Sequence, residues 1–180
     1  MYGLIFIHLL FYISIMIKNI AVLFFLSIYS FSVFAQDIRL FHIERNKNDN
    51  IVCYDLNVEN GKINTTNPIN IYWSNLSNTS FKGNGLSSIE RKLAYGITVN
   101  SVSETKVVFT MKASSDRVIT VSFDSKEKKA STVTVINGEK AILKKMFISA
   151  KAPLYTSVVY AELFGKSVDS AKDLYEKINN

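Results

Sequence analysis

The residues best suited to chemistry in this chain are basic, aromatic and amide side chains gathered in short segments of its first half. Arginine offers a planar fork of donors for carboxylate or phosphate, aromatic rings offer a wall, and asparagine offers neutral polar contacts. A binding site needs a concave surface with a few convergent polar groups, so these types predict a pocket for a small amphipathic or anionic ligand. The candidate ligand-binding residues are Arg45, Asn46, Lys47, Asn48, Tyr54, Asp55, Tyr72, Trp73, Arg91, Lys92 and Tyr95.

The same segments also fit a purely structural interpretation. The Asn-rich stretch 46–50 is typical of a tight turn, because Asn side chains hydrogen-bond their own backbone. The aromatic residues would then belong to the core, with their polar tips satisfied. Arg91 or Lys92 would pair with Asp55. Composition and spacing leave both interpretations open.

Several chemistries lack the residues they need. Beyond residue 35 the chain has one histidine, His42, and one cysteine, Cys53. Zinc sites usually take two or more His or Cys ligands at fixed spacing, and a serine hydrolase needs a nucleophile elbow that the sequence lacks. No glycine-rich phosphate loop occurs either. We therefore expect no catalytic residue, metal or cofactor, and we expect Cys53 to be a buried, inert thiol.

The segments named above also resemble the signature of a known family. The relevant stretches are Arg45–Asn48, Tyr54-Asp55, Pro68-Ile69, Tyr72-Trp73 and Arg91–Gly96, within roughly Phe41 to Gly96. The family is catalogued as domain of unknown function 4833 and occurs in secreted bacterial proteins. The resemblance implies export, but the family brings no established activity and therefore no catalytic residue.

The first 35 residues read as a secretory signal. Lys18 precedes an apolar stretch from Ile20 to Ser32, and Val33-Phe34-Ala35 suits cleavage after Ala35. Residues 1–15 add a second apolar run, which favours a true start at Met16. Alternatively, translation starts at Met1 and the uncleaved segment stays as a membrane anchor, since about 20 apolar residues span a bilayer. We expect residues 36–180 to form a single domain in the periplasm or outside the cell.

That domain is expected to be mainly β. Apolar and polar residues alternate in short runs separated by turn residues, which favours an antiparallel meander forming a small barrel or sandwich. Asn60-Gly61 and Asn137-Gly138 are typical hairpin turns. The expected strands are Ile38–Glu44, Ile51–Val58, Ile69–Trp73, Ile97–Val102, Lys106–Lys112, Arg117–Asp124, Ser131–Ile136, Ala141–Ser149 and Ser157–Phe164.

Two helices complete the expected fold. Ser87 and Glu90 form a capping box that begins a short internal helix, and Gly96 is placed to end it in a left-handed conformation. Near the C-terminus, apolar residues recur at helical spacing from Val168 to Ile178. We expect this second helix to pack its apolar stripe across the sheet.

These features favour an envelope binding module that holds a small amphipathic or anionic ligand. One alternative is an envelope scaffold that binds a protein partner and has no small-molecule site. Another is an enzyme acting on glycan or peptide that uses Asp55 with Tyr or Arg partners, although the sequence marks no general acid–base pair. The formal net charge of +6 is spread along the chain rather than concentrated, so nucleic acid is not an expected partner.

Overall fold

The computed structural model describes residues 35–45, 48–78, 82–150 and 158–179. The chain divides into two compact units, residues 1–33 and 34–180, and every described residue belongs to the second. This unit is mainly β, as the sequence predicts. Within the described ranges, no helix is both long enough and apolar enough to cross a membrane.

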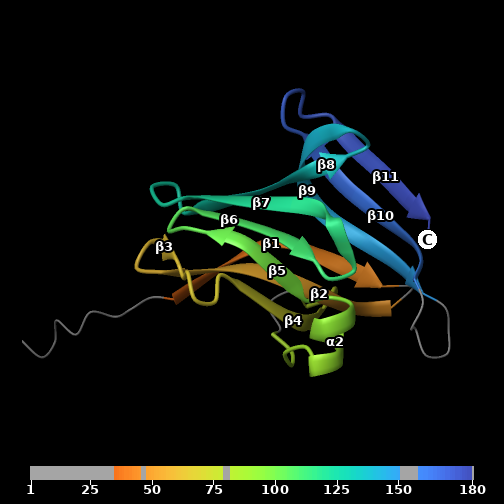
Figure 1. Ribbon diagram of the computed structural model, residues 1–180, viewed down its shortest axis with the longest axis horizontal. Coiled ribbons are helices and arrows are strands. Elements are labelled where there is room, and N and C mark those ends of the chain that lie inside the picture. The colour runs from red at the N-terminus through yellow and green to blue at the C-terminus, as the bar shows by residue number, and fades with distance from the viewer. Residues whose placement is uncertain (1–34, 46–47, 79–81, 151–157, 180) are drawn as a thin grey trace, which may run out of the picture. The chain divides into compact units, whose positions relative to one another are not determined.

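The described strands form one extended, curled sheet (Figure 1). All the expected strands are present, most of them a few residues longer than predicted. Two strands, β3 and β11, were not expected. The strands are β1 (Ala35–Arg45), β2 (Asn48–Glu59), β3 (Lys62–Ile63), β4 (Ile69–Asn75), β5 (Ile97–Val102), β6 (Lys106–Met111), β7 (Ser114–Asp124), β8 (Lys129–Ile136), β9 (Glu139–Ala150), β10 (Val158–Ser167) and β11 (Asp173–Asn179).

The curl of the sheet originates at β9. One edge of β9 pairs with β10 along most of its length. The other edge is shared, because β8 pairs antiparallel with its first part and β1 pairs parallel with its later part, from Lys145 to Ile148. From there β8–β5 run one way and β1, β2 and β4 the other, so the two wings face each other as a half-barrel (Figure 1).

The core fills the space between these wings. It takes alternate residues from each strand, because successive side chains of a strand point to opposite faces. Phe41 and Tyr54 are stacked with ring centroids 4.5 Å apart on one wing, while Phe109 and Val121 are fully buried on the other. The sequence prediction of a barrel or sandwich is therefore correct in its class, and the observed form is a half-barrel.

The predicted hairpin turns are confirmed. Asn60 and Gly61 have φ angles of 53° and 73°, and Asn137 and Gly138 have 50° and 83°. Two successive residues with positive φ are what a two-residue turn needs to match the twist of its strands, and Asn-Gly meets this requirement at low cost. Both turns connect neighbouring antiparallel strands.

The predicted internal helix is also present, as α2 (Ser88–Leu93), with the expected capping box at Ser87 and Glu90. Its end differs from the prediction. Gly96 is not among the described glycines with positive φ, and the helix ends at Ala94 with φ −128°. Gly96 is required for space instead, because a Cβ there would lie 1.8 Å from the carbonyl oxygen of Arg91.

The predicted C-terminal helix is wrong. Residues Asp173–Asn179 form β11, which pairs antiparallel with β10 from Tyr160 to Lys166. Leu174 is buried, whereas Val168 and Ile178, which the helical spacing placed on the same stripe, remain exposed. Apolar residues three and four apart arise here from a turn followed by a strand. Pairing with β10 outweighs this local pattern.

Gly165 allows β10 to lie close to its neighbours. A Cβ at this position would lie 2.6 Å from the carbonyl oxygen of Ile142 and 2.7 Å from Cδ1 of Ile136. Gly165→Ala should therefore lower the free energy of unfolding by about 2 kcal/mol, as overpacking of a filled core does. Urea unfolding would measure the change. Lys166→Ala, an exposed neighbour, should change it by less than about 0.5 kcal/mol, and equal effects of the two substitutions would contradict this packing.

Candidate functional site

The predicted site residues lie on two faces of the wing formed by β1, β2 and β4. Tyr72 and Trp73 are adjacent in β4, so they point to opposite faces. Trp73 packs against the main core, whereas Tyr72 belongs to a separate apolar cluster with Ile51 and Cys53. Tyr54 and Asp55 are likewise adjacent in β2, so their side chains point to opposite faces of the wing. The sequence prediction of one shared pocket is therefore replaced by two groups of residues.

The first group, which we call the Trp73 cluster, comprises Arg45, Trp73, Tyr95 and Glu90. The guanidinium carbon of Arg45 lies 5.8 Å from the centroid of the Trp73 ring, which meets Tyr95 edge-on at 5.6 Å. Arg45 also hydrogen-bonds the Tyr95 side chain, and Trp73 hydrogen-bonds Glu90. The hydroxyl of Tyr54 donates to the carbonyl of Tyr95 at 2.7 Å, which ties the cluster to the core.

The electrostatics of this cluster favour a charged Glu90 and a neutral Tyr95. Burial by itself would raise the pKa of Glu90, but hydrogen bonds from Ser87 and Trp73 and the charge of Arg45 together lower it. Burial raises the pKa of Tyr95, although Arg45 opposes the rise. The cluster therefore brings two opposite charges and two aromatic rings together, and these contacts position the Trp73 ring.

Beside the cluster lies a hollow of about 560 Å³, which we call the Trp73 hollow. Trp73 is the aromatic residue on its lining, and Lys82 is the cationic residue. The other described residues around it are polar or small. They are Asn50, Ser74, Asn75, Gly83 and Asn84.

The position of this hollow follows from strand pairing. Asn50 and Asn75 are a cross-strand pair at the end of β2 and β4. On the far edge of β4, the amide of Trp73 donates to the carbonyl of Asn84 at 3.0 Å, and the amide of Gly83 donates to the carbonyl of Trp73 at 2.8 Å. These bonds hold the segment after β4 against the strand and bring Lys82 to the hollow.

The second group is a network on the opposite face of the wing, formed by Arg39, Asp55 and Tyr72. Arg39 donates from Nε to Asp55 at 2.5 Å and from its guanidinium to the Tyr72 hydroxyl at 3.0 Å. The Tyr72 hydroxyl donates in turn to the other carboxylate oxygen of Asp55 at 2.5 Å. Asp55 is buried. It forms its ion pair with Arg39, and not with the predicted Arg91 or Lys92.

The contacts of this network hold neighbouring strands of the sheet together. Burial first, and then the hydrogen bond to Asp55, raise the pKa of Tyr72 to about 12, so its hydroxyl stays protonated at neutral pH. Both carboxylate oxygens of Asp55 already accept hydrogen bonds. The three residues join β1, β2 and β4 through hydrogen bonds that are buried or partly buried.

A smaller hollow of about 280 Å³ lies beside the Trp73 hollow. The two share Lys82 and Gly83. Lys82 pairs with Asp37 and lies 5.5 Å from the ring centroid of Tyr72. Arg91 reaches the smaller hollow while donating to the carbonyl of Leu86 at 3.2 Å. Arg91 is thus near the site, although not where the sequence prediction placed it.

The remaining predicted residues contribute less. Lys92 is exposed on α2, and no described contact brings it to either hollow. Asn48 begins β2 and pairs with Arg45 in the backbone register. Asn46 and Lys47 lie outside the described residues.

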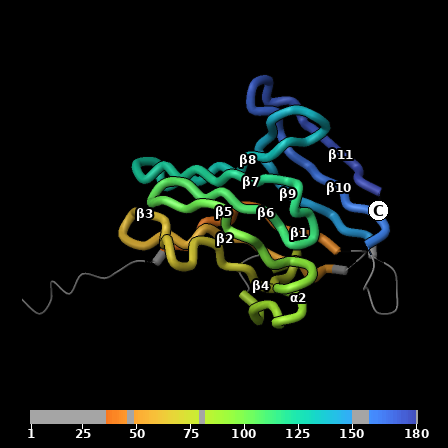
Figure 2. Tube along the Cα trace, in the orientation of Figure 1, coloured from red at the N-terminus to blue at the C-terminus, as the bar shows by residue number. Residues whose placement is uncertain are grey.

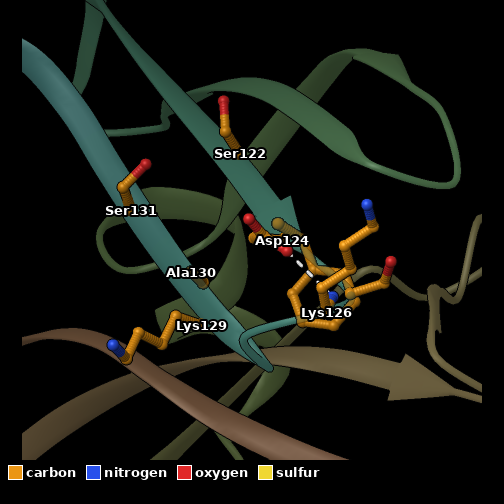
Figure 3. A pocket seen from close by; sticks show the side chains of 8 residues that line it. Ser122, Asp124, Lys126, Lys129, Ala130 and Ser131 are labelled. Atoms are coloured by element: carbon orange, nitrogen blue, oxygen red, sulfur yellow. Dashed lines mark hydrogen bonds between the residues drawn. The ribbon is translucent and has the colours of Figure 1, made fainter.

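A third hollow, of about 590 Å³, lies at the hairpin between β7 and β8 (Figure 3). Its side chains spread outward instead of converging, as Ser122, Ser131 and Lys129 show (Figure 3). Asp124 accepts hydrogen bonds from the amides of residues 126 and 127, so its carboxylate closes the turn. Phe123 is the aromatic residue on its lining, and the polar side chains labelled in Figure 3 do not gather around one point.

Across the described ranges, no cluster of three or more His, Cys, Asp or Glu side chains is placed to hold a metal ion. Cys53 is buried and unpaired with another cysteine, as expected, and burial raises the pKa of its thiol. His42 lies 3.2 Å from Glu44, which also accepts a hydrogen bond from Lys145.

Sequence reasoning missed several residues of this region. Arg39 stands in a strand that mixes apolar and charged residues on both faces, and the irregularity between Arg39 and Phe41 alters the alternation there. The sequence marks Lys82 and Asn84 only as members of a polar loop. Their position depends on the bonds along the far edge of β4, which no local pattern reveals.

Removing the charge of Asp55 should destabilise the domain strongly. Asp55→Asn leaves the partly buried guanidinium of Arg39 without its carboxylate, which should lower the free energy of unfolding by about 2–3 kcal/mol. The surface pair of Lys62 and Glu104 is the matched control. Glu104→Gln should change the free energy of unfolding by less than about 1 kcal/mol. Chemical unfolding of both variants would test this, and equal losses would contradict a structural role for the network.

The raised pKa of Tyr72 predicts a loss of stability at alkaline pH. A tyrosine that ionises near pH 10 when unfolded and near 12 when folded stabilises the folded state below pH 10. That contribution should disappear as the pH rises from about 10 to about 12. Wild type should therefore lose stability more steeply over this range than Tyr72→Phe. Parallel slopes in unfolding experiments at several pH values would refute the prediction.

The comparisons with known proteins give one finding. The family model described as Domain of unknown function (DUF4833) matches residues 41–177, a range that contains the whole Trp73 hollow. The match extends well beyond Phe41 to Gly96, where the resemblance was seen in the sequence. No curated protein and no solved structure matches the chain. Because the family model covers most of its length, the chain belongs to the family described as Domain of unknown function (DUF4833).

Proposed function

We propose that this protein is an exported binding module of the bacterial envelope that holds a small amphipathic ligand with an anionic group in the Trp73 hollow. The observation that carries the proposal is the set of residues on the lining of the hollow, which includes one tryptophan, three asparagines and one lysine. Such a mixture suits a ligand with an apolar part and a charged end. Export is supported by the signal pattern before Gln36.

The cluster behind the hollow supports the proposal by fixing the wall. Arg45 on one side of Trp73, and Tyr95 and Glu90 around it, restrict the orientation of the indole. A ring that is already ordered loses little conformational entropy when a ligand packs on it. Preorganisation of this kind is more useful for binding than for a core contact, because Trp73 stays partly exposed.

Lys82 would make the Trp73 hollow selective for ligands with a negative charge. The side chain of Lys82 is 55% exposed, and it pairs with Asp37, which lines only the smaller hollow. A ligand carboxylate or phosphate in the Trp73 hollow would share or replace that partner. Asn50, Asn75 and Asn84 then offer neutral donors and acceptors to the rest of the head group.

Trp73 itself reports on binding, because it is the one tryptophan of the sequence. Octanoate should shift its fluorescence saturably, since octanoate has both an apolar chain and a carboxylate. Acetate lacks the apolar part and 1-octanol lacks the charge, so both should bind at least about tenfold more weakly, a difference of about 1.4 kcal/mol. Titration of the purified protein with the three compounds measures this order.

Lys82→Met should weaken octanoate binding about tenfold by removing the cation, while Trp73 still reports. Lys129→Met is the matched control, because Lys129 is an exposed lysine on the third hollow. It should bind octanoate as wild type does. The proposal fails if octanoate produces no saturable shift, or if the Lys82 and Lys129 variants bind equally well.

A further inference from the structure

The strand that replaces the expected C-terminal helix leaves one face of the sheet open. A helix there was expected to lie across the sheet, but β11 instead extends it beyond β10 (Figure 2). Among the described elements, β9, β10 and β11 contact their sheet neighbours and no helix crosses them. Within the described part of the chain, no second layer therefore covers the side chains on their outer face.

Strand register arranges these side chains in rows. Lys145, Phe164 and Tyr175 occupy one row across β9, β10 and β11. The next row contains Phe147, Glu162 and Lys177, and the third contains Ser149, Tyr160 and Asn179. We call these nine residues the aromatic face.

The rings of this face are held in place from the side. Phe164 and Tyr175 lie 5.3 Å apart at 49°, and Phe147 and Tyr160 lie 6.1 Å apart at 34°. The ammonium of Lys177 is 3.8 Å from the Tyr160 centroid. These tilted contacts fix the rings without closing them into a core, and Tyr175 keeps 48% of its surface exposed.

The charges of the face are balanced by local partners. Lys145 donates to both oxygens of Glu44, at 3.0 and 3.1 Å. Glu162 accepts the hydroxyl hydrogen bond of Tyr175 at 2.8 Å, and the cation of Lys177 lies over a ring. The face has two lysines and one glutamate, and Glu44 of the neighbouring strand β1 pairs with Lys145. Charges that are balanced in this way attract neither a polyanion nor a basic peptide. It suits a partner that is neutral but rich in hydrogen-bonding groups.

We propose that the aromatic face binds a neutral glycan chain. The flat C–H faces of sugar rings pack on the negative faces of aromatic rings, while sugar hydroxyls bond the carboxylates, ammonium groups and amides between them. A second copy of this chain fits less well, because apposing two such faces would bury paired charges without adding partners. The aromatic face is separate from the Trp73 hollow and needs no ligand there.

An array of glucans, mannans, galactans and chitin oligosaccharides, with alginate and polygalacturonate as anionic polymers, tests the proposal on the purified protein. Saturable binding to a neutral glycan is expected, at least tenfold tighter than to either anionic polymer. The double substitution Tyr160→Ala/Tyr175→Ala should weaken it at least tenfold. Tyr175→Ala alone, at a half-exposed position, should weaken it at least threefold and serves if the double variant is unstable.

Val118→Ala/Val135→Ala is the matched control, because both valines are exposed to about the same extent on β7 and β8. This variant should bind the glycan as wild type does, and so should Lys82→Met, which separates this proposal from that of the Trp73 hollow. Four results would overturn it: no neutral glycan bound, a preference for the anionic polymers, full binding by the tyrosine variants, or dimerisation that those variants abolish.

Discussion

The sharing of one edge of β9 between β8 and β1 is the constraint on which the rest of the structure depends. A strand edge can accept two partners only if each takes part of its length, and the parallel pairing with β1 begins near where the pairing with β8 ends. The two partners lead away in different directions, and the sheet must curl. The curl produces an interior without a second sheet. It also places the β1–β2–β4 wing, which carries both groups of site residues, opposite β5–β8.

Because side chains alternate along each strand, the two faces of this wing carry different sets of site residues. Trp73 and Arg45 stand at the end of the interior, where an aromatic ring remains partly open to a hollow. Arg39, Asp55 and Tyr72 stand on the other side and join three strands through buried and partly buried hydrogen bonds. We interpret the first arrangement as binding and the second as support. A carboxylate whose two oxygens already accept hydrogen bonds has little left to offer a ligand, whereas a positioned ring beside amides and a cation has more.

The parts of the fold that were predictable are those set by local chemistry. Three such features are present: the turn at Asn137-Gly138, the capping box of Ser87 and Glu90, and the strands with alternating apolar residues. Each is determined by residues that are close together in the sequence. The C-terminal segment was not predictable, because pairing with β10 decides its conformation. For the site, Arg45, Trp73 and Tyr95 do converge. The other predicted site residues lie apart from these three, because adjacent residues of a strand point to opposite faces of the sheet. The partners that complete each group are brought there by long-range strand pairing, which the sequence does not reveal.

The central claim is that the Trp73 hollow holds a ligand, and a native mass spectrum of the protein purified from the cells that make it tests this most directly. A species of defined mass should be bound to wild type and lost on mild activation. Trp73→Ala, purified in the same way, should lack it. A wild-type spectrum that shows the bare chain even under gentle conditions, or a bound species equally present in Trp73→Ala, would contradict the claim.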